Sequence, residues 1–307
     1  MSNNEQPRGT KLQDFIAEEV GKVKDVYCPV KAGMLRRILI TKAPIEKLHP
    51  NPDDEFCMPA IGPNMEIVSK YQREFQQLKG NKDAGMFSDI TADKPLQVQK
   101  ITPDGYLILN GHHRWAGAHL AGVPKLNIRI LDLTQKKDIE RALRASKHDR
   151  RVTVDLDEIV FSPDGDDGFE PLLNLWLRRL YKNRIRIGIP ALFRFLSQIG
   201  YDVWVYTANY YSSDYLHYLF KHYHCPVTGV VTGTGRKGPA QTDLKKYLDK
   251  VFQESYQSTL HIDNDSVLQT FTKSRDFRDV PLETNGGRWF QSVMNTVRKM
   301  EAEEAGK

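Results

Sequence analysis

The feature that most constrains the fold is a short apolar run near the middle of the chain that ends in two carboxylates. Residues 151–161 read RVTVDLDEIVF, so a β-branched stretch is followed by Asp155 and Asp157. Such a stretch predicts a buried strand, with both acids where it ends. Ligands of open α/β sheets bind outside the carboxyl ends of the strands, where two acids can hold Mg²⁺ and one can attack phosphorus. The alternative interpretation is a plain polar exit from a strand.

Two later strand candidates end in polar residues in the same way. Residues 201–206 (YDVWVY) lead into Thr207, and residues 259–262 (TLHI) lead into Asp263 and Asp265. The alternation of strands and helices in this half predicts a doubly wound parallel sheet, whose strands end at one shared edge. We therefore expect these polar residues to converge although they lie far apart in the sequence.

These motifs resemble those of the haloacid dehalogenase (HAD) superfamily of phosphohydrolases, across about residues 150–275. The third motif of that superfamily is a lysine that opens a helix, for which Lys237 is the candidate and Lys245 and Lys246 are rivals. The resemblance implies a Rossmann-like parallel-sheet domain. The short spacing between the motifs indicates that any cap over its site is minimal.

The resemblance also implies a two-step phosphatase reaction. Asp155 attacks phosphorus and forms an aspartyl-phosphate, while Asp157 protonates the leaving oxygen and then activates water. Thr207 and Lys237 bind the phosphoryl oxygens and stabilise charge in the transition state. Carboxylates hold the Mg²⁺ ion, and the candidates are Asp155, Asp157, Asp263 and Asp265.

A second constraint lies in the first half, in the box NGHHRW that contains Gly111. A predicted hairpin, formed by residues 96–101 and 106–109, runs into this glycine and then directly into a short helix. Free backbone N–H groups and the positive end of the helix dipole make such a place an anion site. The side chains that would complete it are those of His112, His113 and Arg114. The alternative interpretation is a histidine pair whose hydrogen bonds are satisfied within a helix cap.

The order of elements around this box resembles the ParB/sulfiredoxin superfamily over roughly residues 36–131, beginning with a strand expected at 36–41. The resemblance implies an α+β domain that binds ATP, ADP or CTP through Gly111, His112, His113 and Arg114. Sulfiredoxins carry a catalytic cysteine where this chain has His112 or His113, so sulfinic acid reduction is not expected. In ParB partition proteins a DNA-binding helix-turn-helix region follows this box. In this chain a different kind of sequence follows it.

A further branch that resembles this box comprises small-molecule kinases. In those enzymes an acid in the preceding loop acts as the base toward a substrate hydroxyl. Glu55 is the candidate here, with Asp53 and Asp54 as alternatives. Solvation of a surface loop is the competing interpretation for these acids.

The length of 307 residues suggests about two domains. A charged helix with Thr134 as its N-cap should connect them, with the boundary near residue 148. In chain order we predict an N-terminal arm (1–33), a ParB/sulfiredoxin-like nucleotide-binding domain (34–133), a linker helix (134–149), a HAD-like phosphatase domain (150–285), and a C-terminal helix with an acidic tail (286–307).

Composition leaves the ligand open. The net charge of +5 suits an anionic small molecule as well as nucleic acid. The three cysteines form no CxxC pair, which favours a reducing compartment, and no apolar run approaches a membrane span. We therefore expect a cytoplasmic protein without a membrane segment; the oligomeric state is left open.

Two local clusters have competing interpretations. The basic run from Arg178 to Arg186 is either a solvated helix face or a surface for a polyanionic substrate. The histidines at 217, 222 and 224 with Cys225 suggest zinc, but they straddle a helix end beside Pro226.

Two functions from different classes follow. The first is a Mg²⁺-dependent phosphohydrolase for a small phosphorylated metabolite or nucleotide, with the N-terminal module as a kinase or a recruiting partner. The second is a nucleotide-gated binding protein, switched by CTP or ATP, that acts on nucleic acid or its phosphorylated ends. The set of HAD motif residues favours the first, which makes nucleic acid the less favoured partner.

Overall fold

The computed structural model describes residues 8–23, 28–33, 36–37, 39–80, 94–161, 168–235, 239–283 and 288–306. The chain divides into two compact units: Met1–Asp132 with Arg236–Ala240, and Leu133–Gly235 with Gln241–Lys307. Both are mixed α/β structures built on a six-stranded sheet. No helix in the described ranges is long and apolar enough to cross a membrane.

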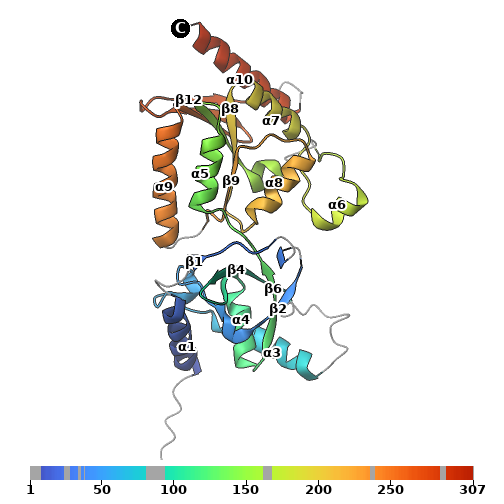
Figure 1. Ribbon diagram of the computed structural model, residues 1–307, viewed down its shortest axis with the longest axis vertical. Coiled ribbons are helices and arrows are strands. Elements are labelled where there is room, and N and C mark those ends of the chain that lie inside the picture. The colour runs from blue at the N-terminus through green and yellow to red at the C-terminus, as the bar shows by residue number, and fades with distance from the viewer. Residues whose placement is uncertain are drawn as a thin grey trace, which may run out of the picture. The chain divides into compact units, whose positions relative to one another are not determined.

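The first unit is a mixed sheet with helices packed against it (Figure 1). Its strand order is β2-β6-β4-β5-β3, and β1 pairs with β4. The strands are β1 (Cys28–Pro29), β2 (Thr41–Pro44), β3 (Leu48–His49), β4 (Leu96–Thr102), β5 (Tyr106–Asn110) and β6 (Lys125–Ile130). The helices are α1 (Arg8–Val23), α3 (Met65–Gly80) and α4 (His112–Leu120), with short 3-10 turns η1 (Ile45–Lys47) and η2 (Glu55–Cys57).

The N-terminal arm is a packed helix. Leu12 and Ile16 of α1 are buried in the core of the first unit. Phe15 stacks on His119 and Trp115 of α4, with ring centroids 3.8 and 5.4 Å apart. The arm predicted at 1–33 is therefore, over α1, part of the first unit.

The strand predicted at 36–41 begins only at the last residue of that range. Residues 36–37 are helical, and β2 begins only at Thr41, which pairs with Ile128. Leu39 and Ile40 are 59% and 52% exposed, so these two apolar residues face solvent. The prediction failed because periodicity in a short apolar run does not reveal whether a partner strand covers it.

The second unit carries four parallel strands extended by an antiparallel pair. The strand order is β12-β11-β10-β7-β8-β9, with β10, β7, β8 and β9 parallel to one another. The strands are β7 (Arg150–Asp155), β8 (Tyr201–Thr207), β9 (Gly229–Thr232), β10 (Ser258–Ile262), β11 (Ser266–Phe271) and β12 (Phe277–Pro281). The last two were not predicted, and they make the sheet mixed rather than purely parallel.

Helices cover both faces of this sheet (Figure 1). One core contains side chains of α7, α8 and α10, and a separate cluster contains side chains of α5 and α9. The helices are α5 (Lys136–Ala145), α6 (Leu175–Leu180), α7 (Ile189–Gln198), α8 (Ser213–His222), α9 (Pro239–Ser255) and α10 (Trp289–Ala305), and a π-helical turn, η4 (Leu156–Val160), follows β7.

The helix expected as a linker belongs to the second unit. Ile139 of α5 is 1% exposed and packs with Trp204 and Val231 of the sheet. Gln135, rather than Thr134, caps the helix, with Asp138 completing a capping box. The Thr134 hydroxyl instead donates a hydrogen bond to the Val230 carbonyl at 2.8 Å. The unit boundary therefore lies after Asp132 and not near residue 148.

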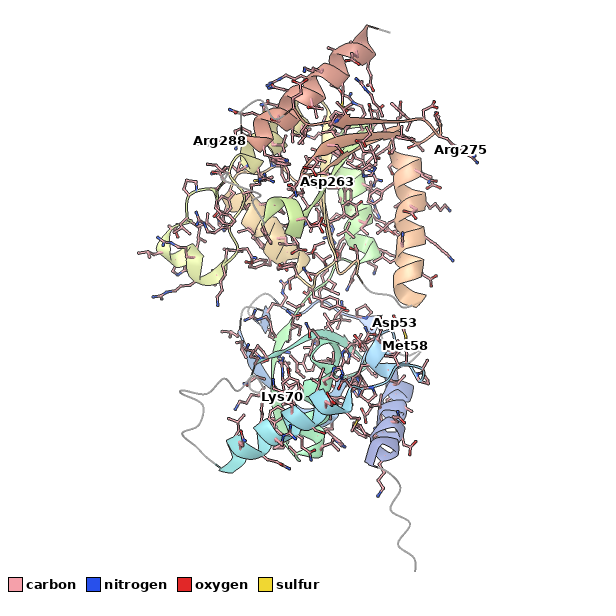
Figure 2. All side chains as sticks on the ribbon, turned by 180° about the vertical axis from the view of Figure 1, so that it is seen from behind. Asp53, Met58, Lys70, Asp263, Arg275 and Arg288 are labelled. Atoms are coloured by element: carbon pink, nitrogen blue, oxygen red, sulfur yellow. The ribbon has the colours of Figure 1, made fainter. Side chains whose placement is uncertain are left out.

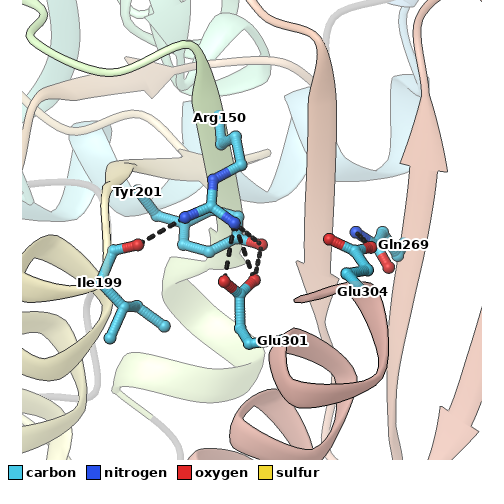
Figure 3. A network of polar contacts seen from close by, with 6 residues as sticks. All are labelled: Arg150, Ile199, Tyr201, Gln269, Glu301 and Glu304. Atoms are coloured by element: carbon cyan, nitrogen blue, oxygen red, sulfur yellow. Dashed lines mark hydrogen bonds and ion pairs between the residues drawn. The ribbon is translucent and has the colours of Figure 1, made fainter. Parts of the chain in front are cut away.

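The C-terminal helix is fixed to the sheet by a polar network (Figure 3). Arg150 at the start of β7 contacts both carboxylate oxygens of Glu301, at 2.7 and 2.9 Å. The Tyr201 hydroxyl donates to the same carboxylate at 2.6 Å, and Arg150 also donates to the Ile199 carbonyl. These polar contacts hold the predicted C-terminal helix on the sheet in addition to the packing of its apolar face.

Candidate functional site

Strand register places the predicted acids at one edge of the second sheet. Ile262 pairs with Val154, so Asp263 and Asp155 leave neighbouring strands at the same level. Asp155 pairs with Tyr206, so Thr207 follows one residue later on the next strand. Adjacent strands lie about 4.8 Å apart. These side chains therefore start from neighbouring backbone positions.

Asp155 caps the helical turn that follows it. Its Oδ1 accepts hydrogen bonds from the backbone N–H groups of Asp157 and Glu158, at 2.7 and 2.8 Å. Both bonds go to Oδ1, and no hydrogen bond to Oδ2 is found among the described residues. The cap also fixes where the chain places Asp157, two residues later.

Asp157 accepts hydrogen bonds at both carboxylate oxygens. The Thr207 hydroxyl donates to Oδ2 at 2.5 Å, and the Tyr211 hydroxyl donates to Oδ1 at 3.2 Å. Burial and the nearby Asp157 carboxylate raise the pKa of Tyr211 to about 12, so this hydroxyl keeps its proton at neutral pH. Two donors of fixed direction thus orient the carboxylate.

Another tyrosine hydroxyl is bound close to Tyr211. Oδ1 of Asn183 accepts a hydrogen bond from the Tyr215 hydroxyl at 2.8 Å, and the Asn183 side chain partly offsets the rise in the pKa of Tyr211. Sequence reasoning missed all three of these residues. For Tyr211 the sequence offered one signal, the pair Tyr210 and Tyr211 shortly after the strand end at Thr207.

The third strand end is held by a buried arginine. Asp263, labelled in Figure 2 just after β10, is exposed, and its Oδ1 accepts the N–H of Asn264 at 2.7 Å. Arg186 is 1% exposed, lies over the Trp289 ring at 4.2 Å, and donates to Oδ1 of Asn264 at 2.9 Å. The side chain of Asp265 is also exposed, and its backbone carbonyl accepts the N–H of Leu282. Arg186 was read as part of a basic surface, but it supports this loop from below.

The fit of Mg²⁺ to this edge rests on two carboxylates. Within the described ranges, no group of three or more His, Cys, Asp or Glu side chains is arranged to hold a metal ion. Asp155 and Asp263 leave neighbouring strands at one level, and Mg²⁺ is commonly bound by one or two carboxylates while keeping several waters. The donor set therefore fits magnesium better than a metal that needs a full protein cage.

The predicted lysine of this site, Lys237, lies outside the described residues. Its rivals Lys245 and Lys246 are exposed within α9.

The suspected zinc ligands form no metal group among the described residues. Burial raises the pKa of the Cys225 thiol to about 12, which disfavours the thiolate that zinc requires.

In the first unit, Gly111 makes the turn from β5 into α4. Its φ of 106° lies in the left-handed region that favours glycine. A Cβ atom at this position would lie 2.4 Å from Cδ2 of Leu96. Strand and helix can therefore join this tightly only through glycine, and the first-turn N–H groups of α4 point out of the helix end.

The two histidines after this glycine hold neighbouring loops. His112 is buried, and its Nε2 accepts the N–H of Asn51 at 3.2 Å. Nε2 of His113 accepts the N–H of Asn64 at 3.0 Å. Burial lowers the pKa of both rings, that of His112 to about 4, so both are neutral at pH 7. Their geometry is that of the helix-cap alternative rather than of cationic phosphate ligands.

Arg114 is likewise engaged with the backbone. It donates to the carbonyls of Lys94 and Pro95, at 2.6 and 3.3 Å, and lies 5.5 Å from the ring centroid of Tyr71. The structure therefore brings the predicted box together, but leaves mainly the backbone N–H groups of the helix end to receive an anion.

The acidic loop before α3 lies against this box. Asp54 caps η2 by accepting the N–H of Phe56, and its Oδ2 is 3.5 Å from Nδ1 of His112. Glu55, the predicted base, is exposed at the start of η2. Asp53 is partly exposed in the same loop (labelled in Figure 2). Asp54 thus contacts the box through His112.

Comparison with known proteins bears on the first unit. Residues 85–147 match the family model described as the ParB N-terminal domain. This range includes β4, β5, α4 and β6, and it runs on through α5 of the second unit. The resemblance to ParB is therefore supported there, whereas no match supports the HAD resemblance. The chain matches no curated protein.

One matching solved structure is described as the C-terminally truncated chromosome-partitioning protein ParB from Caulobacter crescentus, complexed to the centromeric parS site. The two chains share 24% identity, and the alignment covers 35% of this chain and 51% of that one. This chain thus matches about half the length of that structure. The TM-score of 0.22 is too low for any inference about fold or ligand.

Proposed function

We propose that the first unit binds a nucleotide at the start of α4. The observation that carries this proposal is the family match over residues 85–147, which contains the glycine turn at Gly111. Members of the ParB/sulfiredoxin superfamily bind ATP, ADP or CTP at the corresponding box. The match favours the nucleotide-dependent binding function, the second of our two hypotheses, over the phosphohydrolase.

The test is calorimetric titration of the full chain with ATP, ADP and CTP in the presence of Mg²⁺. Gly111→Ala should abolish binding, because a Cβ atom there would meet Leu96 and a φ of 106° strains any side chain. Gly33→Ala is the matched control, since nothing lies within 4 Å of its added Cβ. Equal nucleotide affinity of Gly111→Ala and wild type would show that the nucleotide does not bind at the start of α4.

A second candidate function belongs to the second unit, for which we propose Mg²⁺-dependent hydrolysis of a phosphate monoester. Support comes from the geometry of Asp155, Asp157, Thr207 and Asp263 at one sheet edge. Asp155 would attack phosphorus through Oδ2, because Oδ1 is occupied by the helical turn. Asp157, oriented by Thr207 and Tyr211, would pass a proton to the leaving oxygen and later take one from water. Bound Mg²⁺ would neutralise the phosphoryl oxygens.

Phosphate release from p-nitrophenyl phosphate with Mg²⁺ tests this function. Asp155→Asn should abolish release, and its amide oxygen can still accept the two capping N–H groups, so the fold should persist. Glu158→Gln, a change of an exposed acid in the same turn, should keep activity. Release by Asp155→Asn at the wild-type rate would exclude this mechanism.

A further inference from the structure

The helix α6 has an anchored face and an unusual outer face. Leu173, Leu177 and Leu180 pack against the core of the second unit. On the outside, Leu175 and Trp176 are 76% and 71% exposed, and Leu172 just before the helix is 51% exposed. Single exposed apolar residues are ordinary, but three large ones within five positions indicate a contact surface.

The same face is cationic. Arg178, Arg179 and Lys182 are exposed, and residues 171–182 contain no acid. A simple solvated helix face would not carry an exposed tryptophan among these charges. The combination favours an anionic ligand that also presents flat apolar rings, which is the chemistry of single-stranded nucleic acid. In a duplex the base faces are already stacked, and a helix of six residues is too short to lie as an amphipathic helix in a membrane surface.

Contacts lead from this segment to the carboxylate edge. Tyr181, directly after α6, packs on Tyr215 with ring centroids 5.2 Å apart. The Tyr215 hydroxyl donates to Asn183, the Asn183 side chain interacts with Tyr211, and the Tyr211 hydroxyl donates to Asp157. The end of α6 is thereby tied to the acid that would protonate a leaving group. In Figure 1, α6 lies beyond α8 on the side away from the sheet.

We propose that α6 binds single-stranded nucleic acid and delivers its phosphorylated end to Asp155; this rests on the hydrolase proposed above. Trp176 stacks on a base, and Arg179 and Lys182 contact backbone phosphates. At the end, a bond forms between Asp155 and phosphorus as the bond to the terminal nucleoside oxygen breaks, and Asp157 gives that oxygen its proton. Water then cleaves the aspartyl-phosphate, returns a proton to Asp157, and releases inorganic phosphate.

Binding is measured first, by fluorescence anisotropy of the full chain with labelled single-stranded DNA oligonucleotides that carry a terminal phosphate. Trp176→Ala should weaken binding by on the order of tenfold, the loss typical of one base–aromatic stack. Arg179→Gln should reduce the slope of log affinity against log salt by about 0.7, as expected for one lost phosphate contact to a single strand.

Matched controls come from the β11–β12 hairpin of the same unit. Phe277 is 71% exposed, as Trp176 is, and Phe277→Ala should leave affinity unchanged. Arg275 is exposed at the tip of this hairpin (Figure 2), and Arg275→Gln should leave the salt slope unchanged. Weak binding that Trp176→Ala and Phe277→Ala reduce equally would overturn the proposal, as would binding to anionic phospholipid vesicles but not to oligonucleotides.

Phosphate release separates this proposal from the hydrolase on which it rests. Asp155-dependent release from p-nitrophenyl phosphate, with none from the oligonucleotide, would overturn the nucleic-acid substrate and keep the hydrolase. Release from neither, despite binding that depends on Trp176, would overturn the hydrolase and with it the delivery step. Release from the oligonucleotide that falls in Trp176→Ala, with release from p-nitrophenyl phosphate unchanged, supports the whole proposal.

Discussion

Tyr211 shows how much of the carboxylate site depends on a residue outside the expected motifs. Its hydroxyl is one of the two side-chain donors to Asp157 among the described residues. Tyr211→Phe should lower kcat for p-nitrophenyl phosphate by about tenfold with little change in KM, since a hydrogen bond to a charged group contributes roughly 1.5–3 kcal/mol. Steady-state kinetics checks this, and Tyr218→Phe, which changes an exposed tyrosine on α8, is the control. An unchanged kcat would mean that Thr207 alone positions the acid.

His112 predicts a pH dependence of stability. Burial lowers its pKa to about 4, below the 6.5 of an exposed histidine, so the unfolded chain binds more protons between these values. Stability should be constant above about pH 7 and fall by up to a few kcal/mol as the pH drops from about 6.5 toward 4. Urea unfolding at pH 7 and pH 5 measures the loss. His112→Gln retains an acceptor for the Asn51 N–H without titrating, so its loss should be smaller; an equal loss would assign the effect to other groups.

Residue positions at strand ends could be predicted from the sequence, whereas contacts that depend on loop paths or burial could not. Asp155, Thr207 and Asp263 could be expected at one edge because strand ends of a parallel sheet share it. Arg186 and Asn183 could not, because their roles depend on loop paths that bring distant side chains together. The histidine pair was placed correctly at a helix start, but its charge state depended on burial that the sequence did not reveal.

Among the elements, α10 is joined to β7 by a partly buried ion pair between Glu301 and Arg150. Glu301→Gln should lower the free energy of unfolding by roughly 1–2 kcal/mol, because Arg150 and Tyr201 both lose a charged partner. Glu303→Gln breaks the more exposed pair with Arg278 and should cost less than about 0.5 kcal/mol. Urea midpoints, followed by tryptophan fluorescence, compare the two. Equal shifts would indicate that α10 is held by its apolar face alone.

Elements with strong periodicity were predictable, and those decided by neighbours were not. The parallel strands β7, β8 and β10 and the helices α4 and α10 follow from patterns in the sequence. The pair β11–β12 went unpredicted because its strands alternate weakly and the turn after Asp263 was read only as a ligand site.

For the whole molecule, the position of the unit boundary predicts which fragments of the chain fold stably. Ile139 and Leu143 of α5 cover Trp204 and Val231 of the second sheet. A fragment of residues 133–307 should therefore fold and unfold cooperatively, whereas a fragment that starts at residue 149 exposes that apolar face and should be less stable or aggregate. Circular dichroism melts and size-exclusion chromatography of both fragments decide this. Equal stability would return α5 to the role of a linker.

The hydrogen bonds of Asp155 have a consequence for the energetics of the proposed covalent step. The turn η4 is held by Oδ1 alone, so Oδ2 can be esterified while both capping bonds remain. The free enzyme and the acyl-phosphate form would then share one backbone conformation, and Asp157 would need no movement between its two proton transfers. Catalysis of this kind requires little reorganisation, because the protein is already arranged for the second half of the reaction before the first begins.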